Sequence, residues 1–574
     1  MFRLCWFVVI VGFEVILLVG CEQFPADEEF HQVKIAPEKL RQIGTLDLKQ
    51  VENEKQQRPE EARLPEVNEP PPEQLALTLE QCRALALQNN LDLKVQLINP
   101  AIAAERVSEA EARFEPEFFS NILYNKTDTP VATWLDISGS KVDYSYTDLG
   151  VRMPLRTGGT VTFDVADTRT KTDSLYSIFN PSYGSDLSLS ISQPLLRNAG
   201  NRANTHPIRI ADYDRQIADA TTKLEVIRVI AALDRVYWRL YAARKELDVR
   251  KKQYELAKTQ LDRAQRFVDS GERAQIEITR AEAGVAQQLE AIILAENNLR
   301  DRERELKRVL NKPGLQMQTP TVLVPATQPD PVHYELDRQQ LVQAAIDNRM
   351  ELLEFELQIA KDVSTIDYLR NQALPLVTLD YRYNISGLGQ TRGDSFDLLY
   401  DNKFEDHRFG LNLLVPLGND AARSRLNQAF YQRIQRLSSS QSRRALIELE
   451  VLNAIDQLEA NWQRILASRQ RAILDGRLFE AEQRQFELGL RTSTDVLEAQ
   501  TNFADAQSAE ILALTEYQIA LVDLAYATGT LLGAAKIDWQ PMVPGSSTNS
   551  NEDTPLGSLM REIENLRWIS SEAP

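Results

Sequence analysis

The sequence predicts an α+β fold in which two internal repeats each join strands to very long helices. Two segments share one layout: GERAQIEITRAEA from Gly271 and GLRTSTDVLEAQT from Gly489. Before each of them, apolar residues recur at spacings of three and four over a very long stretch, as in helices that pack side by side. Further upstream, apolar and polar residues alternate with the period of a strand. We therefore expect a duplicated unit of strands, long helix, tight turn and returning helix.

The composition excludes several classes of function. The chain has 574 residues and a formal charge of −18, which is unsuited to a nucleic-acid surface. Its three cysteines and four histidines are scattered, without the spacing of a metal site or of a disulfide framework. No nucleophile–base set, phosphate loop or flanking carboxylate pair stands out. We therefore predict that the chain is not an enzyme and has no catalytic residue, cofactor, bound metal or nucleic-acid partner.

The first residues predict an export signal. Residues 1–20 contain one basic residue and a long apolar run, and they end in Leu-Val-Gly before Cys21. This ending resembles the lipobox of bacterial lipoproteins, which implies cleavage before Cys21 and lipidation of its thiol. Glu14 within the apolar run departs from that pattern, and an uncleaved anchor is the alternative. Glu22 is not the Asp that commonly retains lipoproteins at the inner membrane, so the outer membrane is favoured.

Each repeat is expected to begin with a helix that leads into strands. The segment LTLEQCRALALQNN from Leu77 recurs as LDRQQLVQAAIDNR from Leu336. Each is expected to open one continuous helix of about 35 residues. These helices should end where Pro116 and Pro375 open a strand, because proline breaks a helix.

The strand regions alternate in polarity. In SDLSLSISQPLL, Leu187, Leu189 and Ile191 face one way and the serines face the other. This pattern suits either a sandwich or a barrel with a wet lumen. The first repeat also contains KVDYSYTDLGVRMPL and TVTFDVADT, joined by RTGG, which predict an additional hairpin. That hairpin either enlarges the strand assembly or projects from it as a flap.

The apolar spacing predicts four long helices, at about 205–268, 275–311, 421–487 and 493–530. At 1.5 Å per residue, each of the two longest extends roughly 95–100 Å, which is more than a compact domain needs. Gly271 and Gly489 fall between the helices, where a helix C-cap favours positive φ. Each repeat thus predicts two columns of coiled coil with strands at one end and a turn at the other, as in the wall of a tube.

These features divide the chain into six parts. They are an export signal (1–20), a Pro/Glu-rich arm (21–76), the first repeat (77–312), a linker (313–335), the second repeat (336–533) and a C-terminal tail (534–574).

With these features, the chain resembles the TolC-type outer-membrane efflux protein family. The resemblance is carried by the two helix openings, the proline-led strands, the QPLL segment at Gln193 and the two hairpin tips. It implies a homotrimer in which a long α-helical coiled-coil barrel, the tunnel, continues into a transmembrane β-barrel of the bacterial outer membrane. It also implies a passive exit duct of a tripartite efflux or type I secretion system. The implied partners are outer-membrane lipid, a periplasmic adaptor (membrane fusion) protein and an inner-membrane RND or ABC-type pump.

The resemblance further implies roles for residues at the tips. The acidic residues that ring the family's periplasmic entrance correspond to Asp495 and Glu498, which would attract cations. The polar latch that holds the tips shut corresponds to Arg491, with Glu277 as its acidic partner. Phe486 stands where a tyrosine often contributes to that latch, but phenylalanine has no hydroxyl. The turns that would meet the adaptor contain Gly271, Arg273, Gly489 and Leu490.

Two alternatives remain open from the residues themselves. Thr492 and Asp495 also match a helix-capping motif, which gives Asp495 a structural role that is compatible with lining the entrance. For the whole chain, the alternative is a lipid-anchored, periplasm-spanning coiled-coil protein without a conduit. The serine-lined strand faces and the paired acidic tips favour a conduit.

Overall fold

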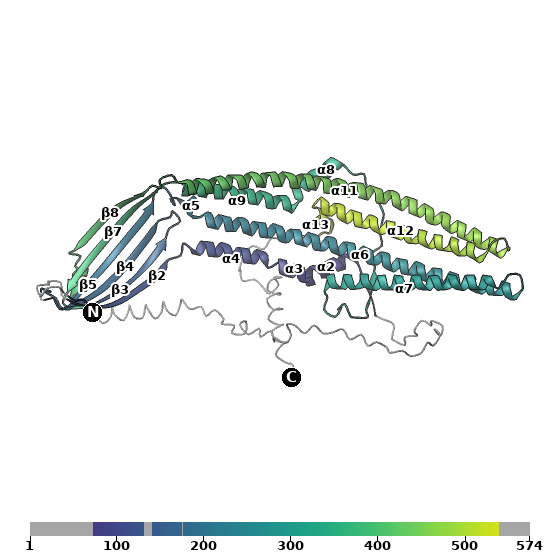
Figure 1. Cartoon of the computed structure of the whole chain (residues 1–574), viewed down its shortest axis with the longest axis horizontal. Coiled ribbons are helices and arrows are strands. Elements are labelled where there is room, and N and C mark those ends of the chain that lie inside the picture. Colours follow the sequence, from purple (N-terminus) through teal and green to yellow (C-terminus); the bar gives the residue numbers. More distant parts are fainter. Residues whose placement is uncertain (1–72, 131–139, 175, 539–574) are drawn as a thin grey trace, which may run out of the picture. The chain divides into compact units, whose positions relative to one another are not determined.

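The computed structural model describes residues 73–130, 140–174 and 176–538, which all belong to one compact unit of the chain. The expected export signal, Cys21, nearly all of the arm and most of the C-terminal tail lie outside the described residues. Strands occupy one end of the unit, and the turns between the long helices occupy the other (Figure 1). None of the described helices combines the length and the apolar character that crossing a membrane requires.

Six of the described strands form one antiparallel sheet in the order β2-β3-β4-β5-β7-β8. Their bounds are β2 Glu117–Asp128, β3 Lys141–Pro154, β4 Thr160–Thr172, β5 Ser182–Pro194, β7 Leu376–Gly389 and β8 Glu405–Leu414. The additional hairpin, β3 with β4, is hydrogen-bonded between β2 and β5 along its whole length. It therefore enlarges the sheet, and the alternative of a projecting flap is wrong. The pairing of β5 with β7 joins the strands of the two halves.

The two faces of this sheet differ in polarity. Residues that pair across strands share a face, so Phe163 lies beside Leu189 and on the same face as Phe409. Phe163 is 48% exposed and Phe409 is 75% exposed. On the opposite face, the Ser192 hydroxyl donates to Asp380 at 2.6 Å. The predicted alternation is confirmed, and it produces one exposed apolar face and one face with a polar network.

The helices that open each half are interrupted, so the expectation of one continuous helix in each is wrong. The segments are α2 Leu79–Asn89, α3 Leu91–Gln96, α4 Asn99–Ala112, α8 Arg338–Asn348 and α9 Met350–Gln372. Asn90 has an extended backbone, and its side chain accepts from the Leu93 N–H and donates to the Val309 carbonyl. Pro100 then falls in the first turn of α4. Proline lacks a backbone N–H, but in the first turn that group would make no hydrogen bond within the helix.

A buried arginine marks the corresponding interruption in the second half. Arg349 has an extended backbone between α8 and α9, and its side chain is 4% exposed. The guanidinium pairs with Glu351 and Glu450 at 2.8 Å each and donates to the Ala527 carbonyl at 3.1 Å. A buried guanidinium needs such partners, since leaving it unpaired would cost several kcal/mol.

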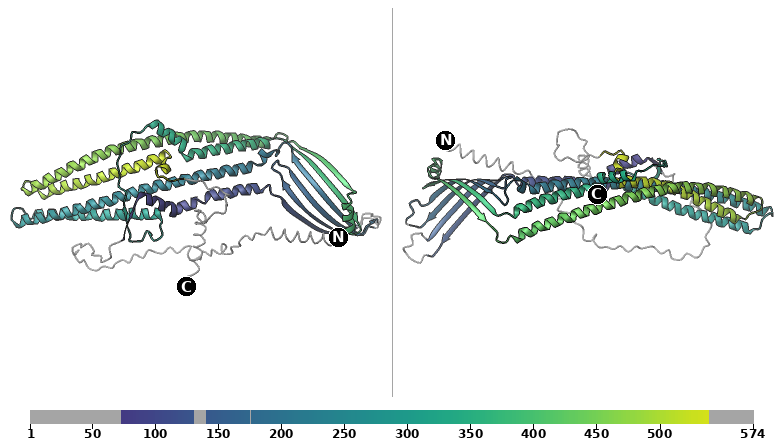
Figure 2. Two further views of the ribbon diagram at one scale, coloured as in Figure 1. Left: turned by 180° about the vertical axis from the view of Figure 1, so that it is seen from behind. Right: turned by 90° about the horizontal axis from the view of Figure 1, so that it is seen from above.

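The four long helices lie close to their predicted positions, at α6 His206–Asp269, α7 Ile276–Leu310, α11 Asp420–Glu487 and α12 Ser493–Ala527. The helices α6 and α7 form one hairpin, and α11 and α12 form a second (Figures 1 and 2). Asp234, which breaks the apolar spacing of α6, is fully buried. Its carboxylate accepts two hydrogen bonds from Arg83 of α2, at 3.0 and 2.7 Å. This partner explains how a charge occupies an otherwise apolar position.

Two of the apolar cores each lie mainly within one hairpin. One core joins α2, α6 and α7 around Tyr237 and Leu306, and the other joins α8, α11 and α12 around Ile447 and Tyr517. The shorter elements are β1 Gln74–Leu77, β6 Val322–Pro325, α5 Asn201–Asn204, α10 Arg392–Tyr400 and α13 Leu531–Ala534. Of these, β1 and β6 form a two-stranded parallel sheet. The long connection after α7 is therefore held to the chain before α2.

Candidate functional site: the tips of the two hairpins

The two tips have the same backbone construction. Gly271 and Gly489 have φ of 78° and 81°. At the first tip, the Glu272 N–H donates to the Phe267 carbonyl at 2.9 Å, and at the second the Leu490 N–H donates to the Gln485 carbonyl at 2.9 Å. This arrangement is the Schellman motif, in which the residue with positive φ is usually glycine. The prediction that both glycines end a long helix is confirmed.

The second tip continues into α12 through a capping box. The Thr492 hydroxyl accepts from the Asp495 N–H, while the Asp495 carboxylate accepts from the Thr492 N–H at 2.9 Å and the Thr492 hydroxyl at 2.8 Å. The hydrogen bond from the backbone N–H of Thr492 is the main cause of a lowered pKa at Asp495. The structural role expected for Asp495 is thus present, and the same contacts keep its carboxylate ionised.

Glu277 connects the first tip to the second. It is 6% exposed, and its carboxylate accepts from the Ser493 backbone N–H at 2.8 Å and from Arg280 at 2.7 Å. Burial acts to raise the pKa of Glu277, but the hydrogen bonds from Ser493 and the charge of Arg280 outweigh it, so the pKa is lowered. The carboxylate also lies at the N-terminus of α12, where the helix dipole favours a negative charge.

Arg273 makes a second link between the hairpins. Its guanidinium donates to the Phe486 carbonyl at 3.2 Å and to the Arg491 carbonyl at 3.0 Å. It also lies over the Phe486 ring, with 5.2 Å from its central carbon to the ring centroid. The ring itself is 1% exposed and packs edge-on against Phe267. Arg273 is therefore engaged within the chain, and Phe486 is a core residue of the tips.

Within one chain, Arg491 and Glu277 do not pair, and their pairing in the assembled tips stays a prediction. The Arg491 side chain lies beside its own hairpin, at 3.1 Å from Glu482 and 3.1 Å from Gln485. Glu277 is already occupied by the N–H of Ser493 and by Arg280. Sequence reasoning placed a basic residue in the link between the tips, but the link is made by the arginine of the first tip.

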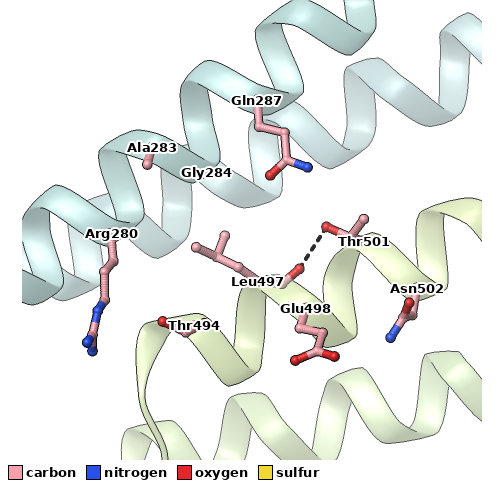
Figure 3. A pocket seen from close by; sticks show the side chains of 9 residues that line it. All are labelled: Arg280, Ala283, Gly284, Gln287, Thr494, Leu497, Glu498, Thr501 and Asn502. Atoms are coloured by element: carbon pink, nitrogen blue, oxygen red, sulfur yellow. Dashed lines mark hydrogen bonds between the residues drawn. The ribbon is translucent and has the colours of Figure 1, made fainter.

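A cleft of about 410 Å³ lies next to the tips, between α7 and α12 (Figure 3). Leu497 points at Gly284 on the facing helix, where a Cβ would come within 2.5 Å of the leucine side chain. The absence of a side chain at Gly284 therefore lets the two hairpins approach closely. Glu498 lines the cleft from α12 and has no ion-pair partner among the described residues. Leu490 at the turn is 72% exposed.

Further contacts between α6 and the second hairpin were not anticipated from the sequence. Arg263 pairs with Glu487 at 3.0 Å, and Gln500 donates to the Gln253 carbonyl at 2.8 Å. Polar residues are frequent along both helices, so nothing in the sequence distinguishes those that cross to the neighbouring hairpin from those that face solvent. Within the described residues, no group of histidine, cysteine and acidic side chains has the arrangement of a metal site.

Comparison with known proteins gives a consistent result. The model of the outer membrane efflux protein family matches residues 83–312 and 341–530. Outer membrane protein TolC of Vibrio cholerae is 25% identical over 354 residues, which are 60% of this chain and 76% of that protein. Outer membrane protein TolC of Salmonella enteritidis is 23% identical over 321 residues, 55% of this chain, and the chain spans only 64% of that relative.

Solved structures show that the fold is shared. The outer membrane channel CmeC of Campylobacter jejuni aligns with a TM-score of 0.57 at 16% identity, over 79% of this chain and 86% of that one. The open state of the MtrE outer membrane channel of Neisseria gonorrhoeae aligns with a TM-score of 0.56 at 13% identity, over 79% and 89%. The resemblance inferred from the sequence is confirmed. The chain belongs to the outer membrane efflux protein family, as an efflux channel of the bacterial outer membrane.

Proposed function

We propose that three copies of this chain form the passive exit duct of a tripartite efflux or type I secretion system. The observation that carries the proposal is the open six-stranded sheet, which continues directly into two long helical hairpins. Its outer strands, β2 and β8, are unpaired on one side within the described chain. In a spacer without a conduit, these strand edges and the exposed apolar face would have no partner. Unpaired strand edges promote uncontrolled pairing with strands of other chains.

Closure of the sheet follows if β8 of one copy pairs with β2 of the next. Three copies with six strands each would give a barrel of eighteen strands, in which no edge remains. The face with Phe163 and Phe409 would lie against lipid, and the face with Asp380 would line a water-filled lumen. The additional hairpin would thus be part of the barrel wall and would widen the duct.

The acidic residues at the tips would set the character of the periplasmic entrance. Three-fold symmetry would bring together three copies of Glu498 and three copies of Asp495, and the resulting negative potential would attract cations. The capping contacts of Asp495 are compatible with this role, because they favour the ionised carboxylate. Glu498 is exposed on the same helix and lines the cleft beside the tips.

The closed state would be held by two links within each chain. Arg273 binds two carbonyls of the second hairpin, and Glu277 binds the first N–H of α12. We assign to Arg491 a supporting role, since its pairing with Glu482 stiffens the turn of its own hairpin. Opening would require the second hairpin to move away from Arg273 and Glu277. Binding of the adaptor at the exposed turn around Leu490 would favour this movement.

The membrane and periplasmic partners complete the proposal. Cleavage before Cys21 and acylation of its thiol would anchor each chain to outer-membrane lipid, and mass spectrometry of the N-terminal peptide from the purified protein would test this. The turns with Gly271 and Gly489 would meet a periplasmic adaptor, which connects the duct to an inner-membrane RND or ABC-type pump. Transport energy would come from that pump, because no catalytic site is expected in this chain.

Single-channel current across a planar bilayer tests the duct. We expect the wild-type protein to give a small, cation-preferring conductance, and the Asp495→Asn/Glu498→Gln variant to lose much of that preference. Both substitutions keep the size of the side chain and remove only the charge. Glu480→Gln is the matched control, because Glu480 is 66% exposed on α11 and away from the turn. A folded trimer that stays silent both as wild type and as Arg273→Ala would contradict the proposal.

A further inference from the structure

A short helix lies against the sheet at the end remote from the long helices. It is α10, which follows β7 and precedes β8 (the short green helix at the end of the sheet in Figure 2). The hydroxyl of Ser395 lies 2.6 Å from that of Ser185 on β5, and both side chains are fully buried. A Cβ at Gly387 would overlap the Ser395 carbonyl, and one at Gly389 would come within 2.6 Å of the Ser395 nitrogen. The helix therefore rests directly on the backbone of the sheet.

The face of the sheet that α10 covers is the apolar one. Ser185 pairs with Gly387, and it lies two and four residues from Leu187 and Leu189 on the same strand, so it shares their face. Arg392, at the start of α10, pairs at 3.0 Å with Asp167, which is the cross-strand partner of Ser185. After α10, the Asn402 side chain accepts from the Tyr383 hydroxyl of that face at 3.4 Å. Charge pairing and close packing hold the helix on this face.

The remainder of the α10 surface carries large aromatic side chains. Phe396 and Tyr400 are one turn apart and lie on one flank of the helix, at 38% and 92% exposure. Phe404, just after the helix, is 60% exposed. Three acidic residues, at positions 394, 397 and 401, have the spacing of a second flank. Beside the side that packs on the sheet, the segment therefore has an exposed aromatic flank and an acidic flank.

We propose that α10 is an interfacial anchor that lies at the lipid–water boundary of the outer leaflet, with Phe396, Tyr400 and Phe404 inserted among the lipids. The inference rests on the proposed function, in which the apolar face of the sheet contacts lipid. The lipid surface is the occupant because α10 packs on the face of the sheet that carries Phe163 and Phe409, at the outer end of that face. Aromatic rings favour the boundary region, and a helix satisfies its own backbone hydrogen bonds there.

Depth-dependent quenching tests the position of α10 in the full-length protein in lipid vesicles. Single cysteines at Tyr400→Cys, Asp397→Cys, Phe409→Cys and Arg484→Cys would carry a fluorescent label. Cys82 does not compete, because it is fully buried and burial raises its pKa to about 12. One set of vesicles would contain nitroxide at the lipid headgroup, and a second set nitroxide deep in the acyl chain. Iodide would report exposure to water.

The inference predicts that headgroup nitroxide quenches the Tyr400→Cys label several-fold more than the label at Asp397→Cys on the other flank. The Phe409→Cys label should respond most to the deep nitroxide, and the Arg484→Cys label only to iodide. A Tyr400→Cys label that behaves like Arg484→Cys, while Phe409→Cys is quenched by lipid, would overturn the inference and leave the proposed function intact. If Phe409→Cys also escapes lipid quenching, the placement of the sheet in the membrane fails, and the proposed function with it.

Discussion

Two charged side chains at the tips add links between the hairpins to the packing contacts already described. Arg273 and Glu277 both lie on the first hairpin and both bind backbone groups of the second. Hydrogen bonds to charged groups contribute about 1.5–3 kcal/mol each where they are shielded from water, and less where they are exposed. Because the partners are backbone atoms, a substitution in the second hairpin cannot remove them. The side chains that make these two links therefore both belong to the first hairpin.

Removing the Arg273 guanidinium should loosen the tips. We expect Arg273→Ala to raise the open probability of the channel in planar bilayers, because two hydrogen bonds to the second hairpin are lost. Arg273→Lys should fall in between, since an ammonium group lacks the planar fork that serves both carbonyls. Arg484→Ala is the control, as Arg484 is 76% exposed and, among the residues that the structure describes, forms an ion pair only with Glu480 of its own helix. Equal open probabilities for Arg273→Ala and wild type would exclude the link.

The link through Glu277 should depend on pH. Its pKa is lowered from the usual 4.5, so the contribution of the ionised carboxylate is complete above pH 4.5 and is lost as the pH falls through the lowered pKa. We therefore expect the open probability to rise on acidification below pH 4.5. Asp495, whose pKa is also lowered, titrates in the same direction at the capping box. The Glu277→Gln variant, measured over the same range, should lose the part of the response that belongs to Glu277; an unchanged response would refute the assignment.

At the scale of elements, buried charges determine how the opening helices dock on the long ones. Asp234 has its carboxylate in the core of the first half, and Arg83 of α2 reaches in to meet it. Burial raises the pKa of Asp234, and the hydrogen bonds and charge of Arg83 oppose that effect only in part. In the second half, the buried charge is Arg349 at the α8–α9 interruption, where it pairs with Glu450 of α11. Each site fixes the position of a helix at the start of one half along the long helix that it packs against, α6 in the first half and α11 in the second.

Breaking one partner of the buried pair should be costly. We expect Arg83→Met to lower the free energy of unfolding by about 3–5 kcal/mol, because Asp234 would remain buried without a partner. The double variant Arg83→Met/Asp234→Leu should recover most of the loss, since neither charge remains. Thermal unfolding followed by circular dichroism would compare the three proteins. A double variant less stable than Arg83→Met would show that the pair itself, and not the stranded charge, supplies the stability.

The close approach of the hairpins near the tips depends on one glycine. The space at Gly284 is filled by Leu497, so Gly284→Ala should push α7 and α12 apart although alanine favours a helix. We expect faster proteolysis at the tips of Gly284→Ala than of the wild type. Gly533→Ala is the control, because a Cβ there would meet nothing within 4 Å. Equal cleavage rates for Gly284→Ala and wild type would contradict a packing role for this contact.

At the scale of the whole molecule, the width of the sheet determines the width of the proposed duct. Strands β3 and β4 are antiparallel neighbours inserted between β2 and β5, so their removal would leave β2 and β5 still antiparallel. Barrel diameter grows with strand number. In the proposed barrel, the hairpin would therefore make the strand end wider than it would be without these two strands.

Deletion of residues 141–172, with a short turn in their place, should narrow the duct. In the background of Arg273→Ala, which is expected to open the tips, the deletion should lower the single-channel conductance and the size of the largest polymer that enters from the outer side. Polymer exclusion in planar bilayers measures both. Unchanged polymer exclusion from a correctly assembled variant would show that the narrowest point lies in the helical tunnel rather than in the strands.

The sequence by itself determined the elements whose signals are local. The long helices, both turns with their glycines, and the strand alternation follow from periodicity and backbone sterics, and each lies close to where it was predicted. Tertiary structure decided the interruptions at Asn90 and Arg349, the place of the additional hairpin and the partners of the charged residues at the tips. These features depend on which segments meet in space. An arginine at a turn has the same local pattern whether it binds its own helix, as Arg491 does, or the neighbouring hairpin, as Arg273 does.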